Sequence, residues 1–440
     1  MKTSTNYTRC RKRVDVDTVD TFPFDILQYI MPCRNRVGHP TYYTKRYADI
    51  IATFDIETTP LDDIKQSVMW HWQSCIDGMV IVGRTWDEYR KFLEQVDKYL
   101  PKGLCFVQFI HNASYEFQFL RSIHDFQPNE VFCLTGRKIA RFDIGNRFEF
   151  RCSYVLTNMS LREFLKKQGV EHQKTEMDYR KQRFYFTDVT RDELDYCIAD
   201  VLGLYEALRK MMKADKMSIA ELPMTSTGYV RNDFKHAMRK GGYISWARGC
   251  APDYDVYLMI RRAFRGGNTH CSRFYTGVIM DNVTSYDRAS SYPDVLVNYP
   301  YPVKPWTEQH ITKLSDMVDG FPYLVEVELW NIRLRDPYET PCPYIAIHKC
   351  FDVDYKHTKN DNGRVCAAPY IKIYLTNIDA EIVRRQYVWD DEKIGKCYRS
   401  EYGMLPDAAI DTIMRYYRMK TELKGVVGQE VFYNKNKALL

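Results

Sequence analysis

The stretch "IATFDIETTP", Ile51 to Pro60, decides how the first part of this chain should fold. It begins as an apolar run of the kind that favours a buried β-strand. Two acids, Asp55 and Glu57, then follow with one residue between them. Side chains alternate between the faces of a strand, so both carboxylates should point the same way and repel each other. We expect a divalent cation between them, since hard cations such as magnesium bind carboxylate oxygens.

Composition sets the broad class of the protein. The chain has 440 residues, 45% of them hydrophobic, and a net charge of +6, which suits about two to four domains and permits nucleic-acid binding without requiring it. The 34 tyrosines could stack on unpaired bases or simply fill aromatic cores. No membrane span or secretory signal is apparent. The 13 cysteines form no CxxC pair, which favours reduced thiols and a cytoplasmic location.

The first half of the chain alternates strand and helix patterns. A capping box at Thr190 and Glu193 marks the start of a long helix. This alternation predicts a mixed α/β layered fold. The expected strands cover 50–57, 78–83, 104–112 and two or three segments within 131–153, and the expected helices cover 85–99, 114–124 and 191–213.

The second half predicts helices to about residue 240 and again from about 406. Between them, a glycine-punctuated basic segment at 263–277 precedes "VTSYDRASSYPDVLVNYP", residues 283–300, which we expect to be a strand that ends in a turn. Further strands are expected at 323–334 and 369–379.

Further acids follow in contexts that resemble Asp55 and Glu57. Glu116 comes just after the apolar run at 104–110, and Tyr196 and Asp200 lie one helical turn apart. Each alone would be weak evidence, because an acid on a helix is usually solvated. A two-metal site, however, needs about three to four carboxylates from separate elements.

In this order the acids resemble the three exonuclease motifs of family B DNA polymerases. The motifs are Asp55-Ile56-Glu57-Thr58, Asn112-Ala113-Ser114-Tyr115-Glu116 and Tyr196-Cys197-Ile198-Ala199-Asp200. The resemblance implies an RNase H-like 3′–5′ exonuclease domain, with two Mg²⁺ or Mn²⁺ ions per active site held by Asp55, Glu57, Glu116 and Asp200. Tyr196 would orient the attacking water, and Thr58, Asn112 and Tyr115 would contact DNA. Glu116 departs from the usual Asp and lengthens that arm by one methylene.

Two further motifs resemble the protein-primed subgroup of the family, the replicases of phages and linear plasmids. "MSLREF" matches a Ser–Leu–x2–hydrophobic motif at Ser160, Leu161 and Phe164, and "QKTEMDYR" matches a Lys–x2–hydrophobic motif at Lys174 and Met177. The resemblance implies that Ser160 and Leu161 bind the single-stranded primer end and that Lys174 assists catalysis.

The second half resembles the start of a right-hand polymerase. "DRASSYP" resembles polymerase motif A, with Ser291 in place of the usual Leu. This implies that Asp287 binds a metal and the incoming dNTP, that Ser290 contacts DNA and that Tyr292 packs under the nucleotide sugar, although Tyr292 could also be a core residue before a turn. The Phe264-Arg265-Gly266-Gly267 sequence matches a (Tyr/Phe)–x–Gly–Gly motif that contacts template DNA, or else forms a tight turn.

The tail supplies Lys420 and Lys437 as expected triphosphate-binding residues. Lys437 would open motif B, and the sequence ends at Leu440. The acidic hairpin of motif C is not found, and we interpret Asp352 and Asp354 as solvated acids. We therefore expect the N-terminal portion of a protein-primed family B polymerase, truncated within motif B and unable to add nucleotides alone.

We expect five segments and several partners. The partners are primer-template and single-stranded DNA, dNTPs and a terminal priming protein, with no membrane. Two rival hypotheses are a stand-alone metal-dependent exonuclease and a non-catalytic module that binds DNA and the priming protein. The segments are a leader (1–45), the exonuclease (46–218), the first part of the palm (219–300), an insertion that docks the priming protein (301–405) and the start of the fingers (406–440).

Overall fold

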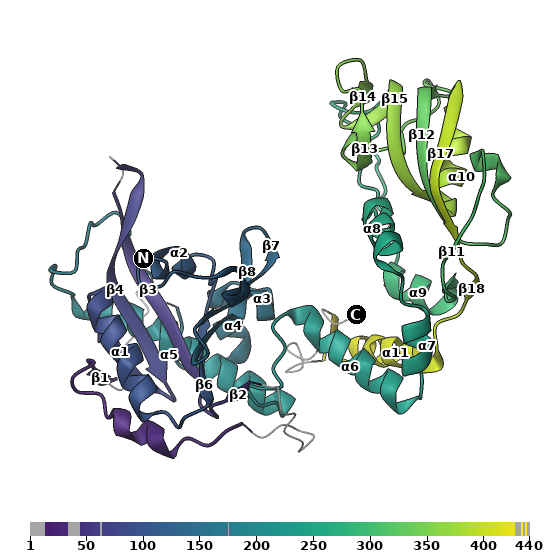
Figure 1. The fold of residues 1–440 in the computed structure, drawn as a ribbon. Coiled ribbons are helices and arrows are strands. Elements are labelled where there is room, and N and C mark those ends of the chain that lie inside the picture. The colour runs from purple at the N-terminus through teal and green to yellow at the C-terminus, as the bar shows by residue number, and fades with distance from the viewer. Residues whose placement is uncertain are drawn as a thin grey trace. The chain divides into compact units, whose positions relative to one another are not determined.

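The computed structural model describes residues 14–33, 45–61, 64–174, 176–426, 433 and 436–437. They form two compact units, the first ending at Asn232 and the second running from Asp233 to Val426 (Figure 1). Residues 1–13 and 34–44 of the expected leader lie outside the described residues. Within the described part of the chain, no helix combines the length and apolar character needed to cross a bilayer.

The first unit is built on a mixed sheet. Its strand order is β1-β5-β4-β3-β6-β9-β8-β7, with β2 paired to β6. The strands β5, β4 and β3 are antiparallel neighbours, whereas β6 is parallel to β3 and β9 is parallel to β6. The strands are β1 (Val16–Asp17), β2 (Arg46–Tyr47), β3 (Ala52–Leu61), β4 (Gln66–Ile76), β5 (Met79–Gly83), β6 (Leu104–Ile110), β7 (Val131–Thr135), β8 (Lys138–Ile144) and β9 (Phe148–Cys152).

Capping boxes start the main helices of this unit. Thr85 and Glu88 cap α1, and the predicted pair Thr190 and Glu193 is confirmed at the start of α5. The helix expected at 114–124 is present but shorter, as α2. The helices are η1 (Phe24–Tyr29), α1 (Trp86–Tyr99), α2 (Glu116–Leu120), η3 (Pro128–Glu130), α3 (Ser153–Thr157), α4 (Leu161–Gln168), α5 (Arg191–Asp215) and α6 (Ser226–Lys240), which runs on into the second unit.

The two faces of β3 meet different layers (Figure 1). Phe54 and Ile56 belong to the hydrophobic core that α1 completes. On the other face, the Thr53 hydroxyl donates a hydrogen bond to the Val201 carbonyl of α5 at 2.8 Å. Because side chains alternate along a strand, Asp55 and Glu57 lie on the face of Thr53, toward α5.

The second unit contains an antiparallel sheet in the order β11-β17-β12-β15-β13, with β14 on β15 and β16 on β12, and a separate β10–β18 pair. Helix α8 packs with Leu324 and Tyr374, whereas α10 packs with Val325 and Leu375 on the opposite face. The strands are β10 (Tyr301–Pro302), β11 (Thr307–Glu308), β12 (Tyr323–Leu334), β13 (Cys350–Val353), β14 (Lys359–Asp361), β15 (Arg364–Thr376), β16 (Tyr387–Val388), β17 (Asp391–Arg399) and β18 (Tyr402–Gly403).

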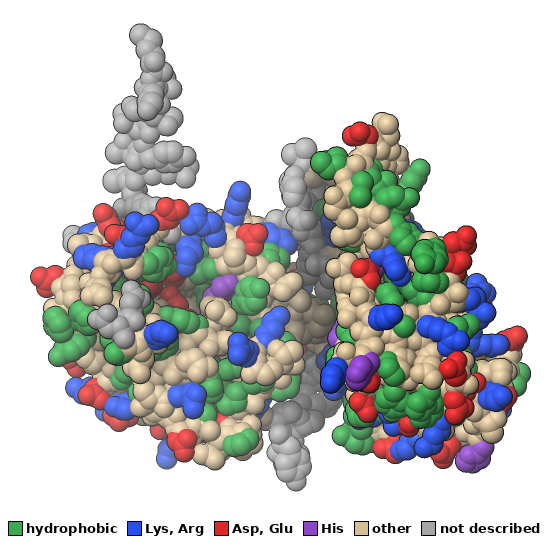
Figure 2. Space-filling model, turned by 90° about the horizontal axis from the view of Figure 1, so that it is seen from above, with side chains coloured by type: hydrophobic (Ala, Val, Ile, Leu, Met, Phe, Trp, Pro, Cys, Tyr) green, Lys and Arg blue, Asp and Glu red, His purple; other side chains and the backbone are tan. Residues whose placement is uncertain are grey.

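The helices of this unit lie between its strands and its irregular segments along the chain. They are α7 (Ile244–Gly249), α8 (Tyr254–Ala263), α9 (Ser291–Asn298), η4 (Leu314–Asp316), η5 (Ile347–Lys349), α10 (Asn377–Gln386) and α11 (Asp407–Glu422). On the face shown in Figure 2, Lys and Arg side chains are interspersed with Asp and Glu rather than gathered into one basic stripe.

The strand expected at the start of residues 283–300 is a wrong prediction. Residues 278–288 have no regular structure, and α9 follows from Ser291. A strand needs a neighbour to complete its hydrogen bonds, and no strand of the described residues pairs with this segment. Pro293 lies in the first turn of α9, where its missing N–H costs nothing. The strand expected to reach Asp379 ends at Thr376, because Thr376 caps α10 in a capping box with Asp379.

Candidate active site in the first unit

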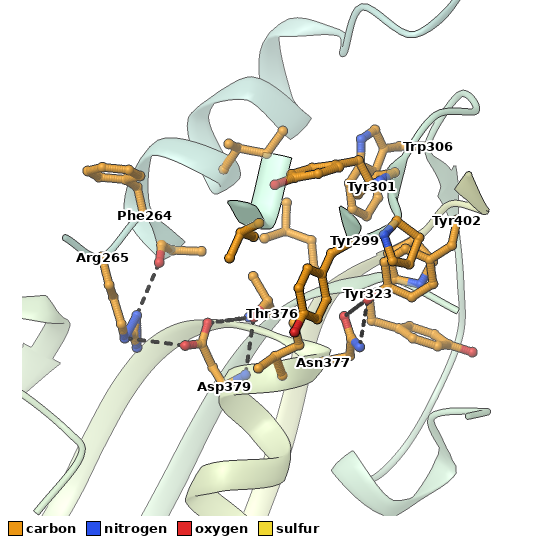
Figure 3. A pocket seen from close by; sticks show the side chains of 18 of the residues that line it. Phe264, Arg265, Tyr299, Tyr301, Trp306, Tyr323, Thr376, Asn377, Asp379 and Tyr402 are labelled. Carbon is orange, nitrogen blue, oxygen red and sulfur yellow. Dashed lines mark hydrogen bonds and ion pairs between the residues drawn. The ribbon is translucent and has the colours of Figure 1, made fainter. Parts of the chain in front are cut away.

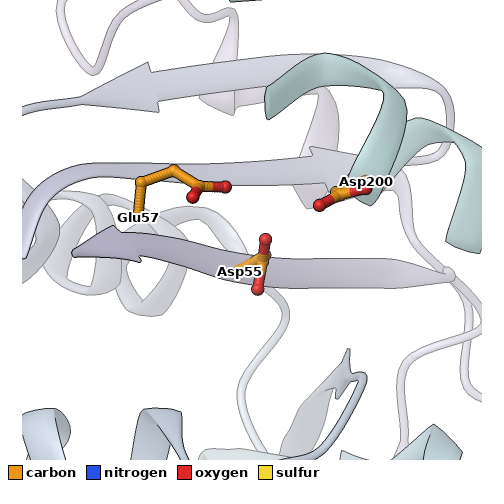
Figure 4. A group of neighbouring side chains, drawn as sticks. All are labelled: Asp55, Glu57 and Asp200. Atoms are coloured by element: carbon orange, nitrogen blue, oxygen red, sulfur yellow. The ribbon is translucent and has the colours of Figure 1, made fainter. Parts of the chain in front are cut away.

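Carboxylates from β3 and α5 converge on the α5 side of the sheet. Ligand oxygens of Asp55, Glu57 and Asp200 all lie within 4.8 Å of one another (Figure 4). Glu116, the first residue of α2, is 3% exposed, and the charge of Asp55 contributes to its raised pKa. The structure therefore gathers the predicted acids in one cluster, in which Asp55 is half-buried and the other three are buried.

Local backbone features place these side chains. The register of β3 against β4 shifts between Glu57 and Thr58, so regular pairing is interrupted beside the acids. Asn112, at a φ of 77°, adopts the left-handed conformation that Asn tolerates, and it turns the chain from β6 toward α2 and Glu116. Asp200 lies one turn after Tyr196 on the buried side of α5.

Burial and mutual repulsion perturb the acids strongly. Burial, followed by the charge of Asp200, raises the pKa of Asp55 from 3.8 to about 7. Burial and then the charge of Asp55 raise the pKa of Glu57 and of Glu116 well above the usual range. Burial also raises the pKa of Asp200. Each acid is thus costly to ionise in the absence of a compensating cation.

Lys174 provides part of that compensation. Its Nζ lies 2.8 Å from Asp200 Oδ2, and its side chain is 27% exposed. Burial disfavours its charge, yet Asp200 and Asp55 together raise the pKa of Lys174 above the usual value. One lysine cannot neutralise four carboxylates, so the cluster keeps a negative excess whenever all four are ionised.

The acid cluster fits divalent metal ions. Glu116 Oε2 and Asp200 Oδ1 are buried and lack a hydrogen-bond partner among the described residues. A buried carboxylate oxygen without a donor is costly. Oxygen ligands from three separate elements are the donor set that Mg²⁺ and Mn²⁺ accept. These residues could therefore hold the metal ions that the sequence predicts.

Several other predicted residues lie at the same site. The Tyr196 hydroxyl is 2.7 Å from the Tyr179 hydroxyl, and Lys174 Nζ lies 5.2 Å from the centre of the Tyr196 ring. The hydroxyls of Thr58 and Tyr115 are hydrogen-bonded at 2.5 Å, and Tyr115 is 42% exposed. The structure thus adds Tyr179, which sequence reasoning missed, to the predicted set.

Sequence reasoning also missed Gln73, whose side chain contacts both Asp55 and Glu57. Gln73 lies on β4, directly opposite Asp55 in the strand register. Since β4 itself was not predicted, this neighbour could not be assigned. The available signal was the polar residues His71, Gln73 and Ser74 within the aromatic-rich stretch "MWHWQSC".

The Ser–Leu motif performs structural tasks in this unit. The Ser160 hydroxyl caps α4 by accepting from the Glu163 N–H, in a capping box. Leu161 and Phe164 are buried in the core between α4 and α5. Their predicted contact with a primer end stays a prediction.

In the second unit, the predicted nucleotide-binding residues lie on different elements: Asp287 on irregular chain, Tyr292 on α9 and Lys420 on α11. Asp287 is exposed and Tyr292 is 73% exposed. Within the described residues, the one group of three acids close enough to share a metal is that of the first unit. Lys420 of α11 donates to the Ser290 hydroxyl at 2.8 Å, so motif A and the expected fingers do meet. Lys437 is exposed.

The glycine motif is exposed at Phe264 and largely buried at Arg265. Phe264 is 67% exposed, but the Arg265 guanidinium donates to the carbonyls of Ala263 and Tyr374 and lies 3.7 Å from Asp379 (Figure 3). Phe264, Arg265 and Gly266 border a cavity of about 720 Å³. Gly267 lies beside the Tyr292 hydroxyl. Arg265 thus anchors the second unit internally, and its predicted DNA contact stays a prediction.

The family model for DNA polymerase type B, organellar and viral, matches residues 157–398. The chain belongs to this family. The matched segment includes Lys174, Asp200 and Asp287 and begins after Asp55, Glu57 and Glu116. No curated protein sequence matches this type B polymerase chain.

Solved structures of Phi29 DNA polymerase resemble the chain. The complex with primer-template DNA and incoming nucleotides has a TM-score of 0.59 at 14% identity, covering 89% of this chain and 67% of that one. The complex with single-stranded DNA has a TM-score of 0.61 at 15% identity, covering 89% and 66%. The binary complex with primer-template DNA has a TM-score of 0.62 at 15% identity, covering 89% of this chain and 66% of that one. The mixed α/β fold predicted from the sequence is thereby confirmed, over about two thirds of the Phi29 chain.

Proposed function

We propose that the first unit is a metal-dependent 3′–5′ exonuclease that acts on single-stranded DNA ends. The observation that carries this proposal is the cluster of half-buried Asp55 with buried Glu57 and Asp200, beside which buried Glu116 lies. Among the described residues, one oxygen of Glu116 and one of Asp200 have no hydrogen-bond partner. A protein rarely buries several carboxylates together without a cation, because each charge loses its hydration. Bound Mg²⁺ or Mn²⁺ would lower the pKa of an attacking water and offset the charge of the phosphate.

The chain's own residues position the reactants. Tyr196, held through its hydroxyl by Tyr179, would orient the water. Lys174 would keep Asp200 ionised and face the scissile phosphate with a positive charge. The hydroxyl pair of Thr58 and Tyr115 sits beside the acids and would hold the terminal nucleotide, with the exposed Tyr115 ring available for stacking on a base.

We further propose that the whole protein is a protein-primed DNA-directed DNA polymerase with proofreading, replicating a viral or plasmid genome in a cytoplasm. Family membership and the fold shared with Phi29 DNA polymerase support this proposal. Asp287, Tyr292, Lys420 and Lys437 would bind the dNTP. Ser290 and the glycine motif beginning at Phe264 would contact DNA, and Ser160 and Leu161 the primer end. The segment 301–405 would dock a priming protein.

Digestion of single-stranded DNA tests the exonuclease. D55A with E57A should abolish Mg²⁺-dependent release of nucleotides from the 3′ end, because both carboxylates lie in the cluster. The control is D87A with E94A, two exposed acids on α1 outside the cluster. Digestion by the D55A/E57A protein at the wild-type rate would refute the site assignment.

Primer extension tests the polymerase half. The D55A/E57A protein, freed of competing digestion, is assayed with and without D287N. Extension that depends on Asp287 would support the proposed dNTP site and would contradict the expectation that the 440-residue chain adds no nucleotides alone. The reading frame downstream of codon 440 separates the polymerase from the rival hypothesis of a stand-alone exonuclease, because a continuing frame that encodes Asn–Ser–x–Tyr–Gly supports the polymerase and a stop codon supports the rival. Absence of digestion by the wild-type protein would favour a non-catalytic module that binds DNA.

A further inference from the structure

Gln73 bridges the two acids of β3. Its side chain is fully buried, at 0% exposure. Its amide nitrogen Nε2 lies 3.0 Å from Asp55 Oδ2 and 3.2 Å from Glu57 Oε1. An amide NH₂ carries two hydrogens, so one nitrogen can donate to both carboxylates at once.

His71 fixes the direction of that amide. Its Nδ1 lies 2.8 Å from Gln73 Oε1, and the ring is 1% exposed. Burial lowers the pKa of His71 to about 4, so the imidazole is neutral at physiological pH. A neutral ring that carries its hydrogen on Nδ1 donates to the amide oxygen and leaves the NH₂ facing the acids. The strand register supports this arrangement, because Gln73 pairs with Asp55 and His71 with Glu57.

We infer that Gln73 is a positioning residue, oriented by His71, that sets Asp55 and Glu57 in the geometry required of metal ligands. The inference rests on the proposed function. Carboxylates two apart on a strand repel each other and would splay. The bridging amide draws one oxygen of each toward the same nitrogen and leaves the remaining oxygens open. Because the amide is neutral, it orients the acids but does not take the place of the cation. A lysine at this position would bring its own positive charge and would replace the cation.

A purely structural role for Gln73 predicts a different outcome, and Gln108 provides the comparison. Gln108 lies on β6 of the same sheet and is 1% exposed. Its Oε1 accepts from the Tyr89 hydroxyl at 2.9 Å, and its Nε2 donates to the Ser74 hydroxyl at 3.0 Å. It is a doubly hydrogen-bonded, buried glutamine whose hydrogen bonds do not involve the acids. Removing either amide leaves buried partners unsatisfied, but only one removal disturbs the metal ligands.

The experiment compares Q73M with Q108M in the full chain. Met matches Gln in length and removes both hydrogen-bonding groups. Mn²⁺ binding is measured by electron paramagnetic resonance without DNA, and unfolding by urea is measured in EDTA. Substituting a residue that hydrogen-bonds to metal ligands typically weakens metal affinity by about 10–100-fold. Q73M should therefore raise the Mn²⁺ Kd at least about tenfold, and Q108M should leave it within about twofold at a comparable loss of stability.

Other outcomes separate the two proposals. If the wild-type chain binds no Mn²⁺, the proposed exonuclease site fails. If wild type and Q73M bind Mn²⁺ equally, or if Q108M weakens binding as much as Q73M, the positioning role of Gln73 is refuted while the site stands. Should Q73M fail to fold, Q73N is used instead, because its shorter amide cannot reach both carboxylates and should also weaken Mn²⁺ binding.

Discussion

Replacing Asp55 by Asn should make the metal-free protein more stable, and more so as pH rises. The pKa of Asp55 is raised from 3.8 to about 7, chiefly by burial. One pKa unit corresponds to 1.36 kcal/mol, so ionising Asp55 in the folded chain costs about 4 kcal/mol. The folded state holds this proton more tightly than the unfolded state. The tighter binding of this proton therefore stabilises the folded state fully below about pH 4, and this stabilisation is lost as pH rises through about 7.

The magnitude appears as a growing difference between two proteins. The free energy of unfolding of D55N should exceed that of wild type by about 1–2 kcal/mol at pH 5 and by about 4 kcal/mol at pH 8. His71 and His111, whose pKa values burial lowers to about 4, make stability rise with pH over part of the same range. Both histidines are present in each protein, so their effect cancels in the difference.

The assay is urea unfolding in EDTA, followed by hydrogen exchange of peptides from β3 and α5, which reports the first unit separately. D87N, an exposed change on α1, serves as the control. Adding millimolar Mg²⁺ should shrink the difference, because the cation stabilises ionised Asp55 in wild type and has lost a ligand in D55N. A difference that stays constant from pH 5 to pH 8 in EDTA would contradict the buried, repulsive cluster described above.

Three further predictions concern single side chains. K174M should lower the free energy of unfolding in EDTA by about 2 kcal/mol, because Asp200 loses its partner, and Mn²⁺ should restore part of the loss in the same urea titration. Y196F should slow digestion of single-stranded DNA by about 100-fold in a single-turnover assay and change stability by less than about 1 kcal/mol. R265M should destabilise the second unit by about 2 kcal/mol in hydrogen exchange, since Asp379 and two carbonyls lose a donor. R265K should recover less than half of that, because Lys lacks the planar fork.

Local patterns were sufficient to predict several elements from the sequence. The helix expected at 191–213 is α5 (Arg191–Asp215), and the one expected at 85–99 is α1 (Trp86–Tyr99). Periodicity and a capping box are encoded within one or two turns, so these elements depend little on distant contacts. Strand β4 was not predicted, because its second half is buried on both faces and its sequence lacks alternation. The strand predicted before Asp287 is not formed. Its local sequence favours a strand, but no described strand pairs with it.

The sequence by itself determined which acids occur, in which order and on which elements. Alternation along β3 already required Asp55 and Glu57 to share a face. Only the tertiary structure decided that Asp200 lies within 4.8 Å of them, that Lys174 pairs with Asp200 and that the Gln73 amide joins the two acids. The physical reason is that local sequence fixes periodicity, whereas packing fixes which faces meet. Packing also removes water from the carboxylates, and that burial raises their pKa values, a cost that a bound cation would offset.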